Sequence, residues 1–328
     1  MFATGLPLVA SSFFSGASFI ITIPSAVATF AWVATIWTGR PIFTTAFLYF
    51  AGFIVMFVIG GVSGVVTAAV PADLQLTDTY FIVAHIHYVL IGINLFGVLG
   101  ALYFWFPKMT GSMLGERLGR WNFWITFIGF NLAFLPMHLT GLMGMPRRVY
   151  TYPRDMGLGG INMVSTAGSF LLSIGILLLL INIWISLRHG GAPDNPWDAP
   201  TLEWSTSSPP PPYNFAFIPA VGSRHPLWED RLQEGSGRSM LTRGFVLDHG
   251  KEALATTVLD AEPDVILKMP EDSPWPFMLT VAISAGFTAM LVQSWWGIAI
   301  ASGGIALCLG FWLWPKRRLL QIGRIGHG

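Results

Sequence analysis

Long apolar segments alternate with short polar ones along most of this chain. A helix that crosses the hydrocarbon core of a bilayer needs about 20 predominantly apolar residues. By that measure the sequence contains about seven candidate spans, and the last two lie so close together that they would form a tight helical hairpin. The candidate spans are residues 10–37, 42–69, 79–106, 120–145, 162–187, 275–293 and 295–314. The pattern predicts an all-α fold, a polytopic membrane helix bundle.

A polar segment interrupts this pattern late in the chain. Charged residues, Pro and Gly concentrate there, and the run Pro209 to Pro212 predicts a stiff extended stretch. Residues 256–264 are strand-like, and the segment carries neither a nucleotide-binding glycine motif nor zinc-ligand spacing. The expected parts are a helix bundle over 1–187, a cytoplasmic Pro-rich linker with a small extramembrane piece over 188–274, and a two-helix membrane anchor over 275–328.

Composition agrees with a chain that is surrounded by lipid. Of 328 residues, 53% are hydrophobic and only 11% are Asp, Glu, Lys or Arg, whereas a soluble domain carries roughly 25% charged residues. These values exclude a disordered chain and argue against a cytosolic enzyme. The net charge of +1 gives no indication of a nucleic-acid partner. Cys308 is the single cysteine and lies in an apolar run, so we expect neither disulfides nor a thiolate metal site.

Positive charges in the short loops predict the orientation in the membrane. More Lys and Arg lie in the loops after the first, third and fifth spans, and in the carboxyl-terminal tail, than on the other side. We place that side in the cytoplasm, so the amino terminus is expected outside. Arg147 and Arg148, in the loop after the fourth span, break this trend, which indicates that they have anionic partners.

Two histidines inside the third span, His85 and His87, are the strongest functional candidates. Ionisable side chains are energetically unfavourable within a membrane, so those that occur there are candidates for function. On an α-helix, residues i and i+2 lie about 200° apart, so the two imidazoles should point to nearly opposite faces and cannot readily share one metal. Neutral imidazole is a common iron ligand, so each histidine could serve a heme on its own side. The alternative is a pair of buried histidines that bond to helix neighbours.

The stretch around these histidines, TDTYFIVAHIHYVLIG, closely resembles the tenth transmembrane helix of subunit I of the heme–copper oxidases of the cytochrome c oxidase type. The resemblance extends over about residues 1–230, and more loosely over 230–328, which resembles carboxyl-terminal extensions of some bacterial subunits. The eighth helix of that family is resembled by FFSGASFIITIPSAVATFAWVATI. The end of the ninth helix and the tenth are resembled by GGVSGVVTAAVPADLQLTDTYFIVAHIHYVLIG, and the eleventh by FIGFNLAFLPMHLTGLMGMPRRVYTYP. Residues 162–187 then stand where the twelfth would be.

This resemblance implies roles for five residues. His85 corresponds to the proximal ligand of the high-spin heme that faces copper, and His87 to one of two axial ligands of the low-spin heme; both hemes would be of the a type. Arg147 and Arg148 correspond to the pair that binds heme propionates by charge-assisted hydrogen bonds, the alternative being a solvated loop pair. Asp78 corresponds to an aspartate near a magnesium ion, the alternative being a helix N-cap.

Several positions depart from the family pattern. Thr77 replaces a histidine before the aspartate, so a magnesium site would have to be built differently. Ala28 replaces the lysine of the eighth-helix proton path, although Ser25 is present, so protons take another route or the activity is altered. Ile86 replaces a phenylalanine, which we interpret as a packing change. His138 fits the family pattern, and we interpret it as a residue that packs and bonds locally.

The copper ligands of the family, a His–x–x–x–Tyr element and an adjacent histidine pair, do not occur in this sequence. We therefore expect the carboxyl-terminal portion of such a subunit, without its first seven helices, in a bacterial inner (plasma) membrane. The complete enzyme would reduce O₂ to water with electrons from cytochrome c, coupled to proton translocation, and this chain alone should be inactive. Expected partners are the missing amino-terminal half, oxidase subunits II and III, cytochrome c, O₂ and the lipid bilayer.

Two other interpretations stay open. One is a non-catalytic membrane scaffold, or a fragment of a split or truncated oxidase gene. The other is a transporter built around intramembrane histidines, which the absence of inverted-repeat signals disfavours.

Overall fold

The computed structural model describes residues 2–211, 214–215, 221, 223–229, 252–256, 263–268, 272–314 and 323–324. The chain forms two compact units, Met1–Pro193 and Asp194–Gly328. The boundary between them falls inside the predicted linker.

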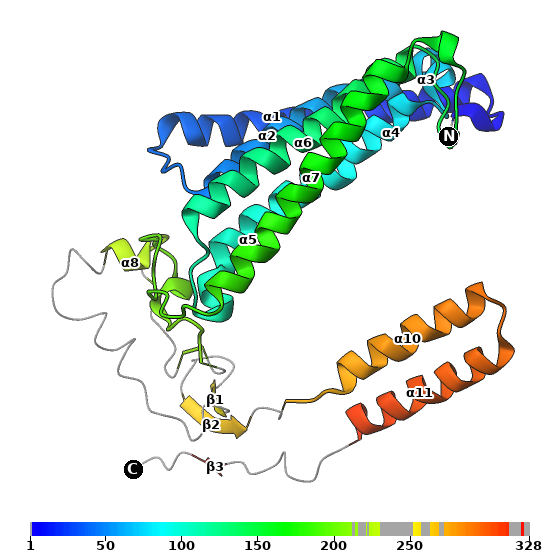
Figure 1. The fold of residues 1–328 in the computed structure, drawn as a ribbon. Coiled ribbons are helices and arrows are strands. Elements are labelled where there is room, and N and C mark those ends of the chain that lie inside the picture. The colour runs from blue at the N-terminus through cyan, green and yellow to red at the C-terminus, as the bar shows by residue number, and fades with distance from the viewer. Residues whose placement is uncertain are drawn as a thin grey trace. The chain divides into compact units, whose positions relative to one another are not determined.

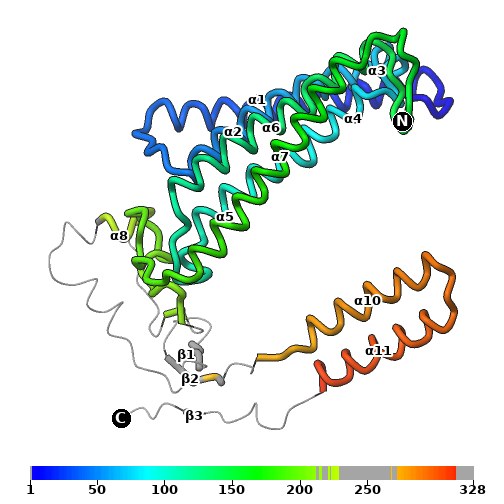
Figure 2. The backbone as a smooth tube through the Cα atoms, in the orientation of Figure 1, coloured from blue at the N-terminus to red at the C-terminus, as the bar shows by residue number. Residues whose placement is uncertain are grey.

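The first unit is a bundle of long helices, which Figures 1 and 2 show as ribbon and tube. Within it, α4, η2 and α5 follow one another without a break and make one helix over Tyr80–Thr110, with π-helical geometry in η2. The elements are η1 (Phe2–Thr4), α1 (Leu8–Thr38), α2 (Thr45–Ala68), α3 (Val70–Leu76), α4 (Tyr80–His87), η2 (Tyr88–Ile93), α5 (Asn94–Thr110), α6 (Glu116–Leu142), η3 (Arg154–Met156) and α7 (Gly159–Ser186).

The second unit contains a helical hairpin and a small sheet. Its elements are η4 (Leu202–Ser205), α8 (Pro226–Glu229), β1 (Glu252–Thr256), β2 (Pro263–Lys268), α10 (Trp275–Leu291), α11 (Trp295–Leu313) and β3 (Gly323–Arg324). The sheet has the order β1-β2-β3 with both pairs antiparallel. In the hairpin, Gly286 lies near Ala301 and Gly304 near Ala282, so small side chains let α10 and α11 approach closely.

The predicted membrane bundle is confirmed. Within the described ranges, six helices are long and apolar enough to cross a membrane: α1, α2, the helix Tyr80–Thr110, α6, α7 and α11. The remaining predicted span appears as α10, which is apolar but shorter. Of the predicted strand-like stretch, β1 ends at Thr256 and β2 begins at Pro263, while 257–262 lie outside the described residues, as does Pro212 of the proline run.

Aromatic rings fill the core of the bundle where α2, α5 and α6 meet. Tyr49 packs edge-on against Phe123 with ring centroids 5.2 Å apart, and Phe96 packs edge-on against Phe130 at 6.1 Å. The buried cluster consists of Tyr49, Met56, Tyr88, Phe96, Leu99, Tyr103, Phe106, Leu114, Phe123, Phe130 and Leu179. Such rings bury a large apolar area with few rotatable bonds, which favours one fixed packing of the helices.

A polar network crosses this aromatic core. Asn122 Oδ1 accepts hydrogen bonds from the hydroxyls of Tyr49 (2.5 Å) and Tyr103 (3.2 Å), and Asn122 Nδ2 donates to the carbonyl of Gly175 (2.7 Å). Asn182 extends the network, because its Nδ2 donates to the hydroxyl of Tyr103 (3.1 Å). Polar groups inside a membrane bundle need internal partners, and these bonds join α2, α5, α6 and α7.

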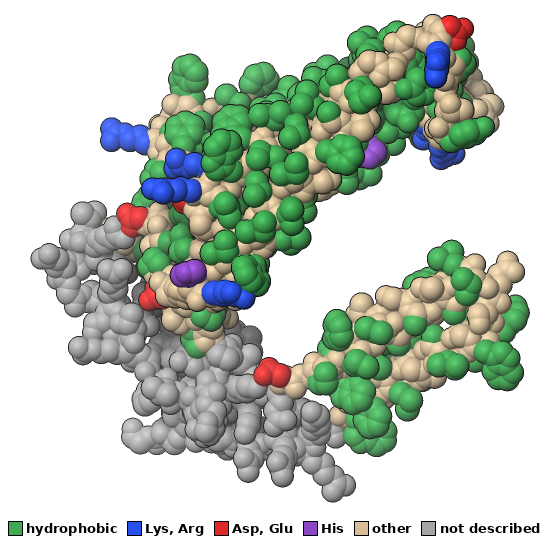
Figure 3. Space-filling view, in the orientation of Figure 1, with side chains coloured by type: hydrophobic (Ala, Val, Ile, Leu, Met, Phe, Trp, Pro, Cys, Tyr) green, Lys and Arg blue, Asp and Glu red, His purple; other side chains and the backbone are tan. Residues whose placement is uncertain are grey.

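The outer surface of the bundle is apolar. Figure 3 shows hydrophobic side chains over the flanks of the helices and most charged side chains towards the ends of the helix bundle. On α1, Ile20, Phe30 and Trp37 are 66%, 73% and 86% exposed. Apolar side chains in such number on the outside of a helix bundle are suited to contact with lipid or with further helices.

Candidate functional site

His85 lies on the face of α4 that packs against α2. Its Nδ1 is 2.9 Å from the hydroxyl oxygen of Ser63 on α2. The ring fits there because Gly64 has no side chain, and a Cβ at that position would lie 3.2 Å from His85 Cε1. Because Nδ1 is engaged by α2, Nε2 is the ring nitrogen left for a ligand.

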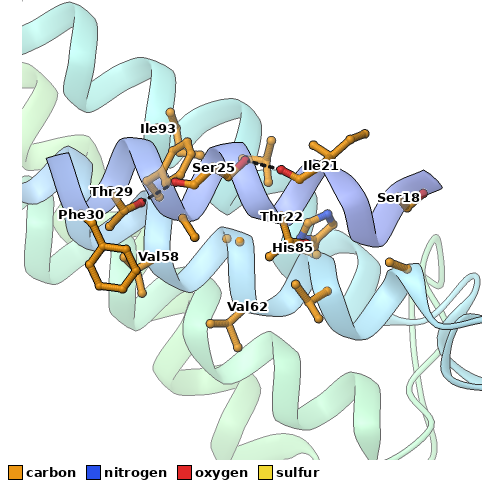
Figure 4. Close-up of a pocket in the computed structure, with 18 residues that line it drawn as sticks. Ser18, Ile21, Thr22, Ser25, Thr29, Phe30, Val58, Val62, His85 and Ile93 are labelled. Atoms are coloured by element: carbon orange, nitrogen blue, oxygen red, sulfur yellow. Dashed lines mark hydrogen bonds between the residues drawn. The ribbon is translucent and has the colours of Figure 1, made fainter. Parts of the chain in front are cut away.

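The ring of His85 borders a pocket of about 550 Å³ between α1 on one side and α2 with the α4–η2 segment on the other. Figure 4 shows the imidazole directed towards α1 near Thr22, with Ser25 and Thr29 further along the same helix. The α2 wall includes three glycines, Gly60, Gly61 and Gly64, beside apolar side chains such as Val58 and Val62. Ser25 donates to the carbonyl of Ile21 (3.0 Å), as hydroxyls in membrane helices commonly do.

His87 points away from this pocket. Its ring stacks on Phe134 of α6, with centroids 4.3 Å apart and planes 15° apart. Its Nδ1 lies 2.7 Å from the carbonyl oxygen of Val83, which can only accept, so Nδ1 carries the proton and Nε2 has the lone pair in the neutral ring. The two imidazoles therefore face different helices, α2 for His85 and α6 for His87, as their spacing predicts. The bond to Val83 is also the helix-neighbour bond of the alternative interpretation.

The π-helical turn η2 begins at Tyr88, directly after His87. Single π-helical turns inside α-helices occur frequently at functional sites. The apolar pattern of this segment does not distinguish a π turn from an α turn, so sequence reasoning missed it. The sequence signal nearest to it is Gly92, where an added Cβ would lie 3.0 Å from the ring of Phe130.

Asp78 and Arg147 join the two loops at the end of the bundle nearest the histidines. Their side chains form an ion pair, and the N–H of Arg147 donates to the carbonyl of Asp78 at 2.8 Å. Thr79, whose hydroxyl accepts from Phe81 N at 3.3 Å, is the N-cap of α4. The N-cap alternative for Asp78 was therefore wrong, because Asp78 adopts a left-handed backbone (φ 62°) and its carboxylate turns to Arg147.

The two arginines of this loop differ in their surroundings. Arg147 is half-buried, and its terminal nitrogen pairs with Asp78. Its Nε is buried and has no hydrogen-bond partner among the described residues. Arg148 is exposed and has a left-handed backbone (φ 65°). Asp78 thus supplies one anionic partner expected for the pair, and Arg147 keeps a donor for another.

Asp78 is the residue expected near a magnesium ion. No group of three or more His, Cys, Asp or Glu side chains that could hold a metal ion occurs in the part of the chain that the structure describes. The magnesium site at Asp78 stays a prediction. His138 packs locally: its ring lies edge-on to Phe81 at 5.0 Å, and its Nδ1 is 3.3 Å from the carbonyl oxygen of Leu135.

Comparison with known proteins assigns this fold to a family. The family profile described as "Cytochrome C and Quinol oxidase polypeptide I" matches residues 1–206. Cytochrome c oxidase subunit 1 of Alkalihalophilus pseudofirmus is 41% identical over 319 residues, which cover 94% of this chain and 48% of that protein. Quinol oxidase subunit 1 of Bacillus subtilis is 39% identical over 313 residues, which cover 94% of this chain and 45% of that protein.

The chain spans about half the length of the curated relatives it matches. Among solved structures, a heme-copper terminal oxidase dimer covers 58% of this chain and 39% of its own with a TM-score of 0.51. The sequence identity is 19%, so this likeness supports the fold alone.

Proposed function

Because this chain belongs to the cytochrome c and quinol oxidase polypeptide I family, we propose that it forms part of the heme-binding core of a terminal oxidase in a bacterial inner membrane. The observation that carries the proposal is the arrangement of His85 and His87. Each imidazole has its Nδ1 engaged by a protein oxygen, and the two rings face opposite sides of one membrane helix. One heme on each side of α4 would then be ligated through Nε2.

The pocket beside His85 supports the proposed heme site. Its volume of about 550 Å³ lies within the roughly 300–1,000 Å³ of ligand pockets in general. Three glycines of α2, Gly60, Gly61 and Gly64, leave room in its lining, and the other lining residues are mostly apolar. When bound, the heme supplies electron transfer and O₂ chemistry, while the protein supplies the axial ligand and the apolar surroundings.

On the opposite face, His87 is proposed as an axial ligand of the second, low-spin heme. Stacking on Phe134 and the bond from Nδ1 to Val83 restrict rotation of the imidazole, so its Nε2 has a fixed direction. The other axial ligand and the copper ligands would come from the amino-terminal helices of the complete subunit. The exposed apolar face of α1 is suited to pack against them.

Arg147 and Arg148 are proposed to bind the carboxylates of heme propionates. The buried Nε of Arg147 has no partner within the described ranges, which supports this role, because a buried donor is destabilising unless it is paired. Asp78 holds the guanidinium from the other loop and so orients it.

The complete enzyme is proposed to take electrons from cytochrome c, with subunits II and III as partners, and to reduce O₂ to water with coupled proton translocation. Quinol is the second candidate donor, because quinol oxidase subunits match this chain at 39% identity, close to the 41% of cytochrome c oxidase subunits. Oxygen uptake by the assembled enzyme with reduced cytochrome c or with quinol distinguishes the two donors. The isolated chain should show no turnover with either.

The ligand assignment is tested by co-expressing the chain with the amino-terminal half of a subunit I and measuring heme content. His85→Ala and His87→Ala should each lower heme content and change a different part of the optical spectrum. His189→Ala is the matched control, because His189 also bonds a carbonyl four residues back, Ile185, but is exposed at the end of α7. If both variants keep the heme content of the parent, the chain is a non-catalytic scaffold and the proposal is wrong.

A further inference from the structure

We propose that Ser63 is the positioning residue for His85, and that its hydroxyl fixes the tautomer and the ring orientation in which Nε2 faces the pocket. The inference rests on the proposed function, because His85 acts there as an axial heme ligand. Ser63 lies on α2, far from His85 in sequence, and is 5% exposed.

The direction of the hydrogen bonds follows from the number of protons available. A serine hydroxyl has one proton to donate. Ser63 Oγ lies 3.0 Å from the carbonyl oxygen of Gly60, which can only accept, so the hydroxyl proton points there. His85 Nδ1 lies 2.9 Å from the same Oγ, so the hydroxyl accepts from Nδ1–H. The resulting chain runs from His85 Nδ1–H to Ser63 Oγ–H to the Gly60 carbonyl.

This chain of hydrogen bonds puts the proton of the neutral imidazole on Nδ1 and leaves the lone pair on Nε2. A hydrogen bond to the far nitrogen of a ligating histidine fixes the ring and makes the ligating nitrogen more basic. Ser63 would thus act on the iron through His85 without touching the heme.

A comparison of two hydroxyl groups on α2 supports the same role. Thr67, one turn further along, bonds the carbonyl of Gly64 at 2.9 Å, which is the ordinary back-bond of a helical hydroxyl. Ser63 makes the equivalent back-bond to Gly60 and in addition accepts from His85, which lies 22 residues away in sequence. The missing Cβ at Gly64 then gives the imidazole the space to reach this hydroxyl.

The test compares variants in the assembled oxidase. Ser63→Ala removes the acceptor, Ser63→Thr keeps a hydroxyl, and Ser63→Cys replaces it with a weaker acceptor of similar size. Ser165→Ala is the matched control, because Ser165 is also 5% exposed and its Oγ has no partner among the described residues. The main readout is the iron–histidine stretching frequency of the reduced heme by resonance Raman spectroscopy, together with heme content.

Ser63→Ala should lower the stretching frequency and weaken heme retention by about tenfold, the low end of the effect expected when an outer partner of a ligand is removed. Ser63→Cys should shift the frequency in the same direction by less, and Ser63→Thr and Ser165→Ala should match the parent. A parent-like frequency in Ser63→Ala or Ser63→Cys, with heme bound, overturns the inference about Ser63 alone. Unchanged heme content in His85→Ala overturns the proposed ligand as well, so the two failures are distinguishable.

Discussion

The carboxylate of Asp78 is paired with the guanidinium of Arg147, and the backbone N–H of Arg147 donates to the carbonyl of the same aspartate at 2.8 Å. A second backbone bond, from Tyr80 N to the carbonyl of Met145 at 2.9 Å, joins the first residue of α4 to the loop after α6. The loop before α4 and the loop after α6 therefore form one connected structure. It holds Arg147 in place next to the beginning of the helix that carries both histidines.

Asp78→Asn should remove the ion pair without changing the backbone, because asparagine adopts the left-handed conformation more readily than most residues. The side chain of Asp78 is 64% exposed and that of Arg147 29%, so the pair is partly screened by solvent. We expect a loss of at most about 1 kcal/mol in the free energy of unfolding. Thermal unfolding in detergent at low and high salt measures it. High salt should reduce the difference in unfolding midpoint between variant and parent. A loss of several kcal/mol in the free energy of unfolding that is independent of salt would contradict this account.

Arg147→Lys should weaken heme retention more than Arg148→Lys. Lysine keeps the positive charge near Asp78 but has no equivalent of Nε, the buried donor of Arg147 that is unpaired in the part of the chain that the structure describes. Arg148 is exposed, so its replacement by lysine should change fewer contacts within the loop. The heme content of each variant, measured after purification of the assembled oxidase, allows the two replacements to be compared. Equal losses would show that the buried Nε is not the group that matters.

The helices were predictable because a membrane-spanning segment must satisfy its own backbone hydrogen bonds, which restricts it to a long apolar helix. The opposite orientations of His85 and His87 were predictable for a related reason, since the helical period alone fixes them. Neither property requires knowledge of what each helix contacts.

The features that were missed depend on contacts between distant segments. Thr79 rather than Asp78 caps α4, although both residue types are good caps, because pairing with the loop around Arg147 sets the backbone there. Ser63 is one hydroxyl in an apolar span, and only the packing of α2 on α4 brings it to His85. The three-dimensional arrangement of α2, α4 and α6 is thus what turns two histidines in a sequence into a candidate site.

Asn122→Leu should destabilise the bundle more than any replacement of an exposed polar residue in the same helices. The change keeps the branching and the number of heavy atoms but removes the acceptor of Tyr49 and Tyr103 and the donor to Gly175. Removing one partner leaves buried groups unpaired at roughly 1–3 kcal/mol each in water-soluble proteins, while pairs in membrane helices average about 0.6 kcal/mol. We therefore expect a loss of about 2 kcal/mol, measured by denaturation in mixed micelles.

Asn94→Leu is the control for this replacement. Asn94 is on α5, and its Nδ2 donates to the carbonyl of Leu90 in the preceding turn at 2.9 Å in an exposed position. Its replacement should change the stability by less than about 0.5 kcal/mol. A similar effect of both replacements would mean that the Asn122 network does not hold the helices together.

The contact between α6 and α7 depends on glycine, and Gly168→Ala should disrupt it. A Cβ at Gly168 would collide with the backbone of Ala133, and one at Gly129 would lie 2.5 Å from Leu172 N. Neither obstacle is a flexible side chain, so the helices would have to separate, at a cost of about 1–3 kcal/mol.

Gly160, in the first turn of the same α7, has no atom within 4 Å of an added Cβ. Gly160→Ala should therefore be neutral or stabilising, because alanine favours helix over glycine. Thermal unfolding of both variants in one detergent, followed by circular dichroism, should separate them by several degrees, and equal midpoints would contradict close glycine packing of α6 on α7.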